Sequence, residues 1–162
     1  NTNTKNFTNL YKLFSIKKVM QVLGFNFTKI LAEKVSNVTK PPVTNIEFID
    51  LKKERVDFLK ETEAVKVSFK YDLIYESERK EEDSKERTRE GNVLFEGNVI
   101  ISLNKDELKE ITKSWKKKSL PEDVKIPIFN LILRRCTPKA VQLQDEINLP
   151  FHVPMPRVGR NQ

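Results

Sequence analysis

Cysteine, histidine and glycine are scarce in this chain, and their scarcity excludes several kinds of site. Among 162 residues there is one cysteine, Cys136, one histidine, His152, and only four glycines. No disulfide can form within the chain, which fits a reducing compartment. A zinc site needs about three or four protein ligands, and a phosphate-binding loop needs several closely spaced glycines. We therefore expect no metal and no other cofactor.

Groups suited to catalysis are equally sparse, so we expect a protein that is not an enzyme. His152 lies in a proline-rich segment without a sequence signal for a nucleophilic partner. Arg134 and Arg135 precede Cys136, and such neighbours can lower the pKa of a thiol. A lone cysteine on a helix is more often a small buried apolar residue. No paired-carboxylate motif stands out among the many acids.

Long apolar runs are missing as well. No run approaches the roughly 18 residues of a membrane span, and lysines and asparagines interrupt residues 7–31 too often for a signal peptide. We therefore expect a soluble, cytoplasmic protein. Apolar residues, ten of them Phe, still make up 38% of the chain, which is enough to build the core of one folded domain.

The net charge of +7 is concentrated at one end of the chain. Residues 1–40 contain seven lysines against one acid, Glu33, and residues 41–162 carry a net charge of only +1. Three roles are open for this basic segment. It can pack on the sheet or on a twin subunit, lie on an anionic membrane surface, or contact RNA or another acidic surface such as the ribosome. The excess of lysine over arginine and the lack of an RNA-binding motif disfavour nucleic acid.

Apolar residues recur at helical spacing over residues 9–23, and the period then changes. Gly24 stands where a helix C′ residue is expected, since glycine adopts the left-handed conformation freely. Alternation over residues 25–35 predicts a strand. A single helix running through Gly24 is the alternative, because the three–four spacing continues. We favour the break, which gives two expected units: 1–24, a basic amphipathic helix, and 25–162, an α+β domain.

Three further strands are predicted. The first covers residues 43–51, with an extension to residue 58 as the alternative, and the clearest covers residues 64–76. A run of mixed charges over residues 77–91 reads as a solvated loop, and alternation resumes over residues 92–103, with Gly97 as a candidate bulge. The last two strands follow one another directly, so antiparallel pairing is expected. One face of the clearest strand is apolar throughout: Val65, Val67, Phe69, Tyr71, Leu73 and Tyr75.

Two helices are predicted after the strands. Asn104 and Glu107 form a capping box that opens the first helix, which carries Trp115 on its apolar stripe. The second helix begins near Pro121, and Pro138 predicts that it kinks or restarts there. Three prolines then keep residues 149–156 extended.

The expected fold class is therefore α+β, with a four-stranded antiparallel sheet, two C-terminal helices on one face and an added N-terminal helix. A sheet covered by two helices cannot easily enclose every aromatic side chain predicted on it. We expect the surplus apolar surface to form a partner interface or a binding groove.

The stretch from Asn92 to Val158 resembles the C-terminal half of the SecB-type export chaperones. The resemblance rests on the strand FEGNVIISL, the helix DELKEITKSW, a second helix introduced by IPIFNLILRRC and the tail LPFHVP. It extends, by the order of the elements, over residues 25–158. It implies an ATP-independent holdase that binds unfolded or preprotein polypeptides in an apolar groove, in a homodimer or homotetramer. Eight client-binding residues are implied: Phe69, Tyr71, Tyr75, Trp115, Leu149, Phe151, Val153 and Met155.

Two features depart from that family. Its members are acidic and meet a translocation ATPase through an acidic sheet surface, whereas the body of this chain is nearly neutral. The last residues of the sequence are GRNQ, and from them we expect no tail that would dock on the ATPase. A basic adaptor or an RNA- or ribosome-associated module is the alternative function. A subunit whose apolar face is covered by a permanent partner is a third.

Overall fold

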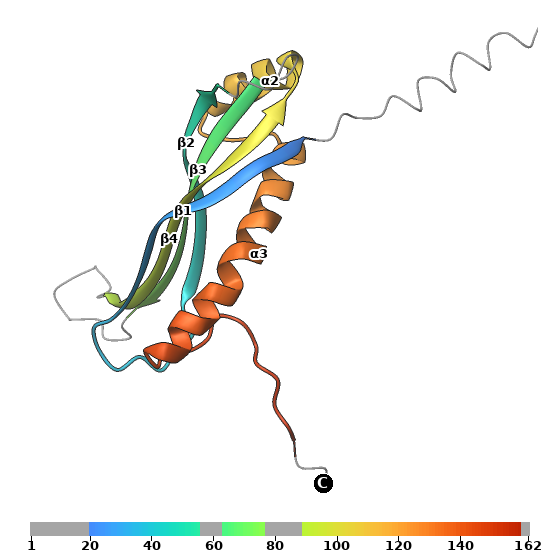
Figure 1. The fold of residues 1–162 in the computed structure, drawn as a ribbon. Helices are drawn as coiled ribbons and strands as arrows, with labels where there is room; N and C mark the ends of the chain where they lie inside the picture. Colours follow the sequence, from blue (N-terminus) through green and yellow to red (C-terminus); the bar gives the residue numbers. More distant parts are fainter. Residues whose placement is uncertain (1–19, 56–62, 77–88, 160–162) are drawn as a thin grey trace, which may run out of the picture.

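A computed structural model describes residues 20–55, 63–76 and 89–159, which form a four-stranded antiparallel sheet and two helices (Figure 1). The order in the sheet is β1-β4-β3-β2, so β1 and β2 are the edge strands. The long helix α3 lies along one face of the sheet, and the expected α+β fold is confirmed. The bounds are β1 (Gln21–Lys34), β2 (Val43–Glu54), β3 (Glu63–Glu76), β4 (Arg89–Leu103), α2 (Lys105–Trp115) and α3 (Glu122–Glu146).

The core lies between α3 and the two central strands. The apolar face predicted for β3 is confirmed, because all six of its side chains are at most 1% exposed. Every second residue of β4 joins them, from Val93 to Leu103. The buried residues of α3 recur every fourth position, and the contact stripe therefore winds slowly around the helix: Val124, Ile128, Ile132, Cys136, Ala140 and Gln144.

The ends of the helices agree closely with the sequence prediction. The Asn104 side chain accepts hydrogen bonds from the backbone N–H groups of Asp106 and Glu107, and the Glu107 carboxylate accepts one from the N–H of Asn104. This is the predicted capping box. Pro121 is the N-cap of α3. α3 is one helix that contains Pro138, so it does not restart there. Cys136 and Ala140, on either side of this proline, are both fully buried.

The expected N-terminal boundary is wrong. β1 begins at Gln21, so a helix cannot extend to Leu23, and Gly24 lies inside the strand with no positive φ. The pairing with β4 has irregularities at Leu23 and Thr28, and each adds one residue to β1. Leu23, the last residue of the predicted helical stripe, is thus an extra residue of the strand. The strand predicted over residues 25–35 is confirmed, since β1 extends to Lys34. The rest of the predicted helix, residues 9–19, lies outside the described residues.

The limits of two other strands refine the prediction. β2 ends at Glu54, between the two predicted ends at residues 51 and 58. β4 begins at Arg89, so the last three residues of the charged run 77–91 belong to a strand, and residues 77–88 lie outside the described part of the chain.

Gly97 is required by close packing, and the predicted bulge lies in its partner strand instead. Gly97 of β4 pairs with Phe27, next to the extra residue Thr28 of β1. A Cβ atom at Gly97 would clash with the carbonyl oxygen of Asn26 and would lie 2.8 Å from the ring of Phe69. Glycine therefore lets an aromatic ring lie directly on the backbone of β4.

We expect Gly97→Ala to lower the free energy of unfolding by about 1–3 kcal/mol, because overpacking forces the backbone or the ring to move. Gly24→Ala is the matched control. Its Cβ would meet only Ile100, at 3.7 Å, and it should be neutral or stabilise the fold by about 0.4–1 kcal/mol. Urea unfolding measures both, and equal effects of the two substitutions would contradict the packing argument.

Candidate functional site

Four of the eight residues implied as client-binding lie in the core. Phe69 and Tyr71 have no exposed surface, Tyr75 is 1% exposed and Leu149 is 4% exposed. Phe69 lies beside the ring of Phe25, with ring centroids 5.4 Å apart. These side chains hold the sheet, α3 and the tail together, and a ligand on the surface cannot reach them while the core is closed.

The other four lie at opposite ends of the molecule. Trp115 is partly exposed at the end of α2, before α3 begins. Phe151 and Val153 are partly exposed and Met155 is 45% exposed in the tail that follows α3. A helix of 25 residues spans about 37 Å at 1.5 Å per residue, and Figure 1 shows α2 and the tail at its two ends. The structure therefore does not bring Trp115 and the tail into one groove.

A hydrogen-bond network fixes the start of this tail to the core. Gln144, fully buried in α3, donates from Nε2 to the Tyr75 hydroxyl (2.7 Å) and to the Pro150 carbonyl (3.1 Å). The Tyr75 hydroxyl donates to the same carbonyl at 2.7 Å. His152 Nδ1 lies 2.8 Å from Gln144 Oε1. One buried amide thus ties β3, α3 and residues 150–152 together.

His152 in this network fits only its neutral form. Gln144 Oε1 is an acceptor, so the proton must lie on Nδ1. Nε2 is buried and has no hydrogen-bond partner within the described residues, and the ring meets Tyr71 edge-on at 6.3 Å. Burial lowers the pKa of His152 below its usual value of 6.5, since a second proton would place a charge where no acceptor lies.

Cys136 behaves as the sequence indicated. Its side chain is fully buried in the α3 stripe. Burial raises the pKa of its thiol to about 12, and the opposing effect of Arg135 is smaller. The thiol stays protonated near neutral pH and serves as an apolar side chain of the core.

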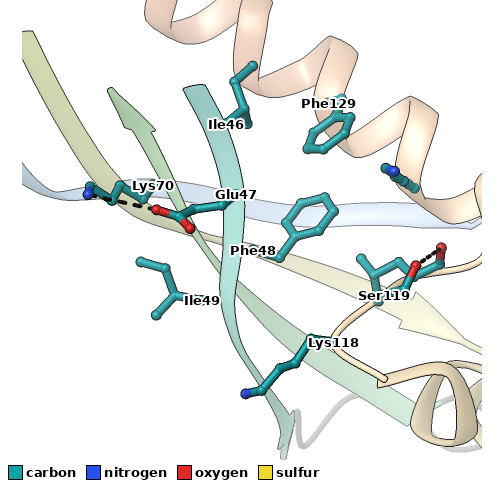
Figure 2. A pocket seen from close by; sticks show the side chains of 10 residues that line it. Ile46, Glu47, Phe48, Ile49, Lys70, Lys118, Ser119 and Phe129 are labelled. Atoms are coloured by element: carbon teal, nitrogen blue, oxygen red, sulfur yellow. Dashed lines mark hydrogen bonds and ion pairs between the residues drawn. The ribbon is translucent and has the colours of Figure 1, made fainter. Parts of the chain in front are cut away.

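An open depression of about 650 Å³ lies beside β2, at the start of α3. Its aromatic surface comes from Phe48 of β2 and Phe129 of α3, whose rings stack with centroids 4.8 Å apart and an interplanar angle of 14°. Figure 2 shows these two side chains pointing toward one another. We call this depression the β2 trough. It is lined by Ile46, Glu47, Phe48, Ile49, Lys70, Lys118, Ser119, Leu120, Lys125 and Phe129.

Lysines dominate the charge around the β2 trough. Lys70 lies 3.7 Å from Glu47 and 3.5 Å from the buried carboxylate of Asp72. Lys118 and Lys125 form no ion pair within the described residues. The Lys118 ammonium lies 5.1 Å from the centre of the Trp115 ring, and that of Lys125 lies 5.5 Å from the centre of the Phe129 ring. The lining holds three lysines against one glutamate.

The trough opens at an edge strand. β2 pairs with β3 on one side, and no described strand pairs with its other side. The register with β3 is regular from Val43 to Phe48 and is interrupted at Ile49, before Asp50. The backbone groups of these six residues that face away from β3 form a short stretch of open sheet edge beside the stacked rings.

The sequence prediction missed the trough residues. Ile46 and Phe48 belong to the alternating pattern of β2, so their face could be read. Their position at an edge follows from the strand order, which the sequence did not predict. Lys118 belongs to a run of three lysines that follows Trp115, and such a run is favourable at the C-terminal end of a helix without any binding role.

We expect His152 to make stability depend on pH. The folded-state pKa is depressed, so the unfolded chain binds a proton in a range where the folded chain does not. The contribution is complete above about pH 6.5 and is lost as the pH falls through the lower folded-state value. His152→Asn keeps an amide that can donate to Gln144 and removes the titration. Urea unfolding between about pH 7.5 and pH 5 should show a shallower loss for this variant; equal slopes would contradict the assignment.

Within the described ranges, no cluster of three or more His, Cys, Asp or Glu side chains is arranged to hold a metal ion. Neither helix of the described chain is both long and apolar enough to cross a membrane. Comparisons with protein-family models, with curated proteins and with solved structures find no significant match to this chain.

Proposed function

We propose that this protein is an ATP-independent holdase that binds extended segments of unfolded polypeptides at the β2 trough. The observation that carries the proposal is the stacked pair Phe48 and Phe129, which lies beside an unpaired strand edge. A protein groove next to such an edge can take an extended peptide as an added strand.

Strand geometry favours this use of the trough. Side chains of an added strand alternate between the two faces of the sheet, and every second one would lie over Phe48 and Phe129. The regular edge from Val43 to Phe48 has six residues, which corresponds to about 20 Å of extended chain. A bound segment of about six residues therefore matches the edge, with two or three apolar side chains in the trough.

Unfolded chains offer partners for both the strand edge and the aromatic rings of the β2 trough. They present free backbone N–H and C=O groups together with exposed apolar side chains, whereas a folded protein has already paired and buried most of both. Aromatic surfaces accept many apolar partners, so a broad range of segments can bind. Binding the unfolded state withholds it from aggregation by mass action, without ATP.

The resemblance to SecB-type chaperones implies the same function, a holdase, but it implies different client-binding residues. It implied a site made by β3, α2 and the tail, and the structure favours β2 and the start of α3. A homodimer or homotetramer and a role in protein export remain parts of the proposal. The alternative of a basic adaptor for RNA or the ribosome rests on the N-terminal segment, whose residues 1–19 lie outside the described part, so the structure gives it no separate support.

Removing the two stacked rings should weaken client binding. We expect Phe48→Ser with Phe129→Ala to lower the affinity for a fluorescent unfolded peptide by about 10- to 100-fold, since each aromatic side chain contributes about 1.5–3 kcal/mol when it is fully buried. The control Val35→Ser changes a side chain that is 64% exposed and lies outside the trough. Fluorescence anisotropy measures affinity, and circular dichroism checks that the double variant folds.

The same proteins should differ in holding a denatured client in solution. The wild type and Val35→Ser should suppress its aggregation at near-stoichiometric ratios, and the double variant should not. If the folded double variant binds as the wild type does, the trough is not the site. If the wild type neither binds peptides nor suppresses aggregation, the holdase proposal is wrong.

Backbone pairing with β2 can be tested separately. In an added strand every second amide faces β2 and the others face away. Two peptides of the same sequence, N-methylated at the odd or at the even positions, should therefore differ in affinity by at least about tenfold, because one loses several hydrogen bonds of about 0.5–1.5 kcal/mol each. Equal binding of the two peptides would exclude strand addition and leave only side-chain contacts.

A further inference from the structure

We infer that the β2 trough selects polypeptide segments in which an apolar centre is flanked by acidic residues. This inference rests on the proposed function and names the class of client. Its basis is the pair of lysines, Lys118 and Lys125, which line the trough and form no ion pair within the described residues.

The position of Lys125 in α3 is one at which a lysine does not stabilise the helix. It lies in the first turns of α3, and positive charge near a helix N-terminus is unfavourable. Its ammonium lies over the Phe129 ring at 5.5 Å. The two acids of the first turn, Glu122 and Asp123, are exposed and do not line the trough. Lys125 therefore presents its charge to whatever lies on Phe129.

Lys118 occupies a backbone position that favours glycine. Its φ of 56° lies in the left-handed region, which is costly for residues that carry a Cβ atom and free of that cost for glycine. The lysine side chain at this position reaches over Trp115 and lines the trough. A residue kept in a costly conformation beside a candidate site points to a role of its side chain.

The balance of charge in the trough fits acidic segments. Glu47 is matched by Lys70, which also lies near Asp72. The Asp50 carboxylate, which also attracts Lys118, is paired with Lys52 at 2.7 Å.

The charges of Lys118 and Lys125 can therefore act on the bound segment. Their ammonium groups lie 5.1 Å and 5.5 Å from the centres of the Trp115 and Phe129 rings, and both would attract a carboxylate of the bound segment. A lysine or arginine beside the apolar centre of a client would be repelled by the same two lysines.

Three peptides with one apolar centre of six residues, flanked by pairs of Glu, Gln or Lys, test this inference. Fluorescence anisotropy of the wild-type protein should show the Glu-flanked peptide binding at least about fivefold more tightly than the Gln-flanked one, and the Lys-flanked peptide binding most weakly. The preference should shrink between about 50 mM and about 300 mM NaCl, as screening increases.

The double variant Lys118→Gly with Lys125→Gln should lose the preference and keep the affinity for the Gln-flanked peptide. Its thermal unfolding temperature should not fall on account of position 118, because glycine adopts this backbone conformation freely. Asn148→Gly is the matched control. Asn148 is the other described non-glycine residue with positive φ, at 51°, it lies after α3, and its substitution should leave the preference unchanged.

Each outcome bears on a different claim. Equal affinity of the wild type for all three peptides overturns the inference and leaves the holdase proposal standing. Failure to bind any of them overturns both. A preference for the Glu-flanked peptide that survives in the double variant overturns the assignment to Lys118 and Lys125 and places the selecting charges elsewhere in the chain.

Discussion

The packing of one long helix on two central strands is the interaction on which the rest of this structure depends. α3 approaches the backbone of β4 more closely than that of the other strands, and the rings of β3 and β4 are sealed beneath it. A helix with its side chains is about 10 Å wide, whereas four strands spaced about 4.8 Å apart form a broader layer. One helix therefore covers the centre of the sheet and leaves both edges partly open. β2, two strands away from β4, is left with the wider gap, and the trough lies there.

The protein covers its edge aromatics with long cationic side chains. At the β1 edge, Arg135 lies 5.1 Å from the ring centre of Phe25, and Lys139 lies 5.7 Å from that of Phe27. At the β2 edge, Lys125 lies over Phe129. Such side chains shield apolar surface with their stems and keep their charges in water. They cover a ring less completely than a packed core side chain does. An apolar ligand can therefore displace them at little cost in free energy.

The sequence predicted β3 most accurately, because its spacing stays regular, and it predicted β1 over residues 25–34 but missed the start of that strand at Gln21. β3 keeps strict alternation, and its buried face was predicted residue by residue. In β1, Val22, Phe25, Phe27, Ile30 and Ala32 pair with the core-facing residues of β4. Their spacing alternates between three and two residues because Leu23 and Thr28 are extra, and a three-residue step looks helical. Alternation over residues 25–35 was still enough to predict the strand, whereas its start at Gln21 depends on the pairing with β4, which local patterns do not contain. The capping box of α2 is wholly local, which is why the sequence sufficed for it.

The dependence on strand order also explains why the sequence prediction assigned the exposed apolar surface to β3 and not to β2. Large aromatic residues such as Phe69 and Tyr71 are conspicuous in the sequence, yet they occupy the centre of the sheet, where α3 seals them. Phe48 is less conspicuous and remains half-buried because β2 is an edge. At the C-terminal end of α3, the hydrogen-bond network of Gln144 holds the start of the tail, and Leu149 is buried there. The chain itself therefore covers the core at that end. No described segment closes the start of α3 in the same way. The stacked rings there are left beside a strand edge that no described strand pairs with and beside two lysines that form no ion pair within the described residues. An extended chain with apolar and acidic side chains complements all three features at once.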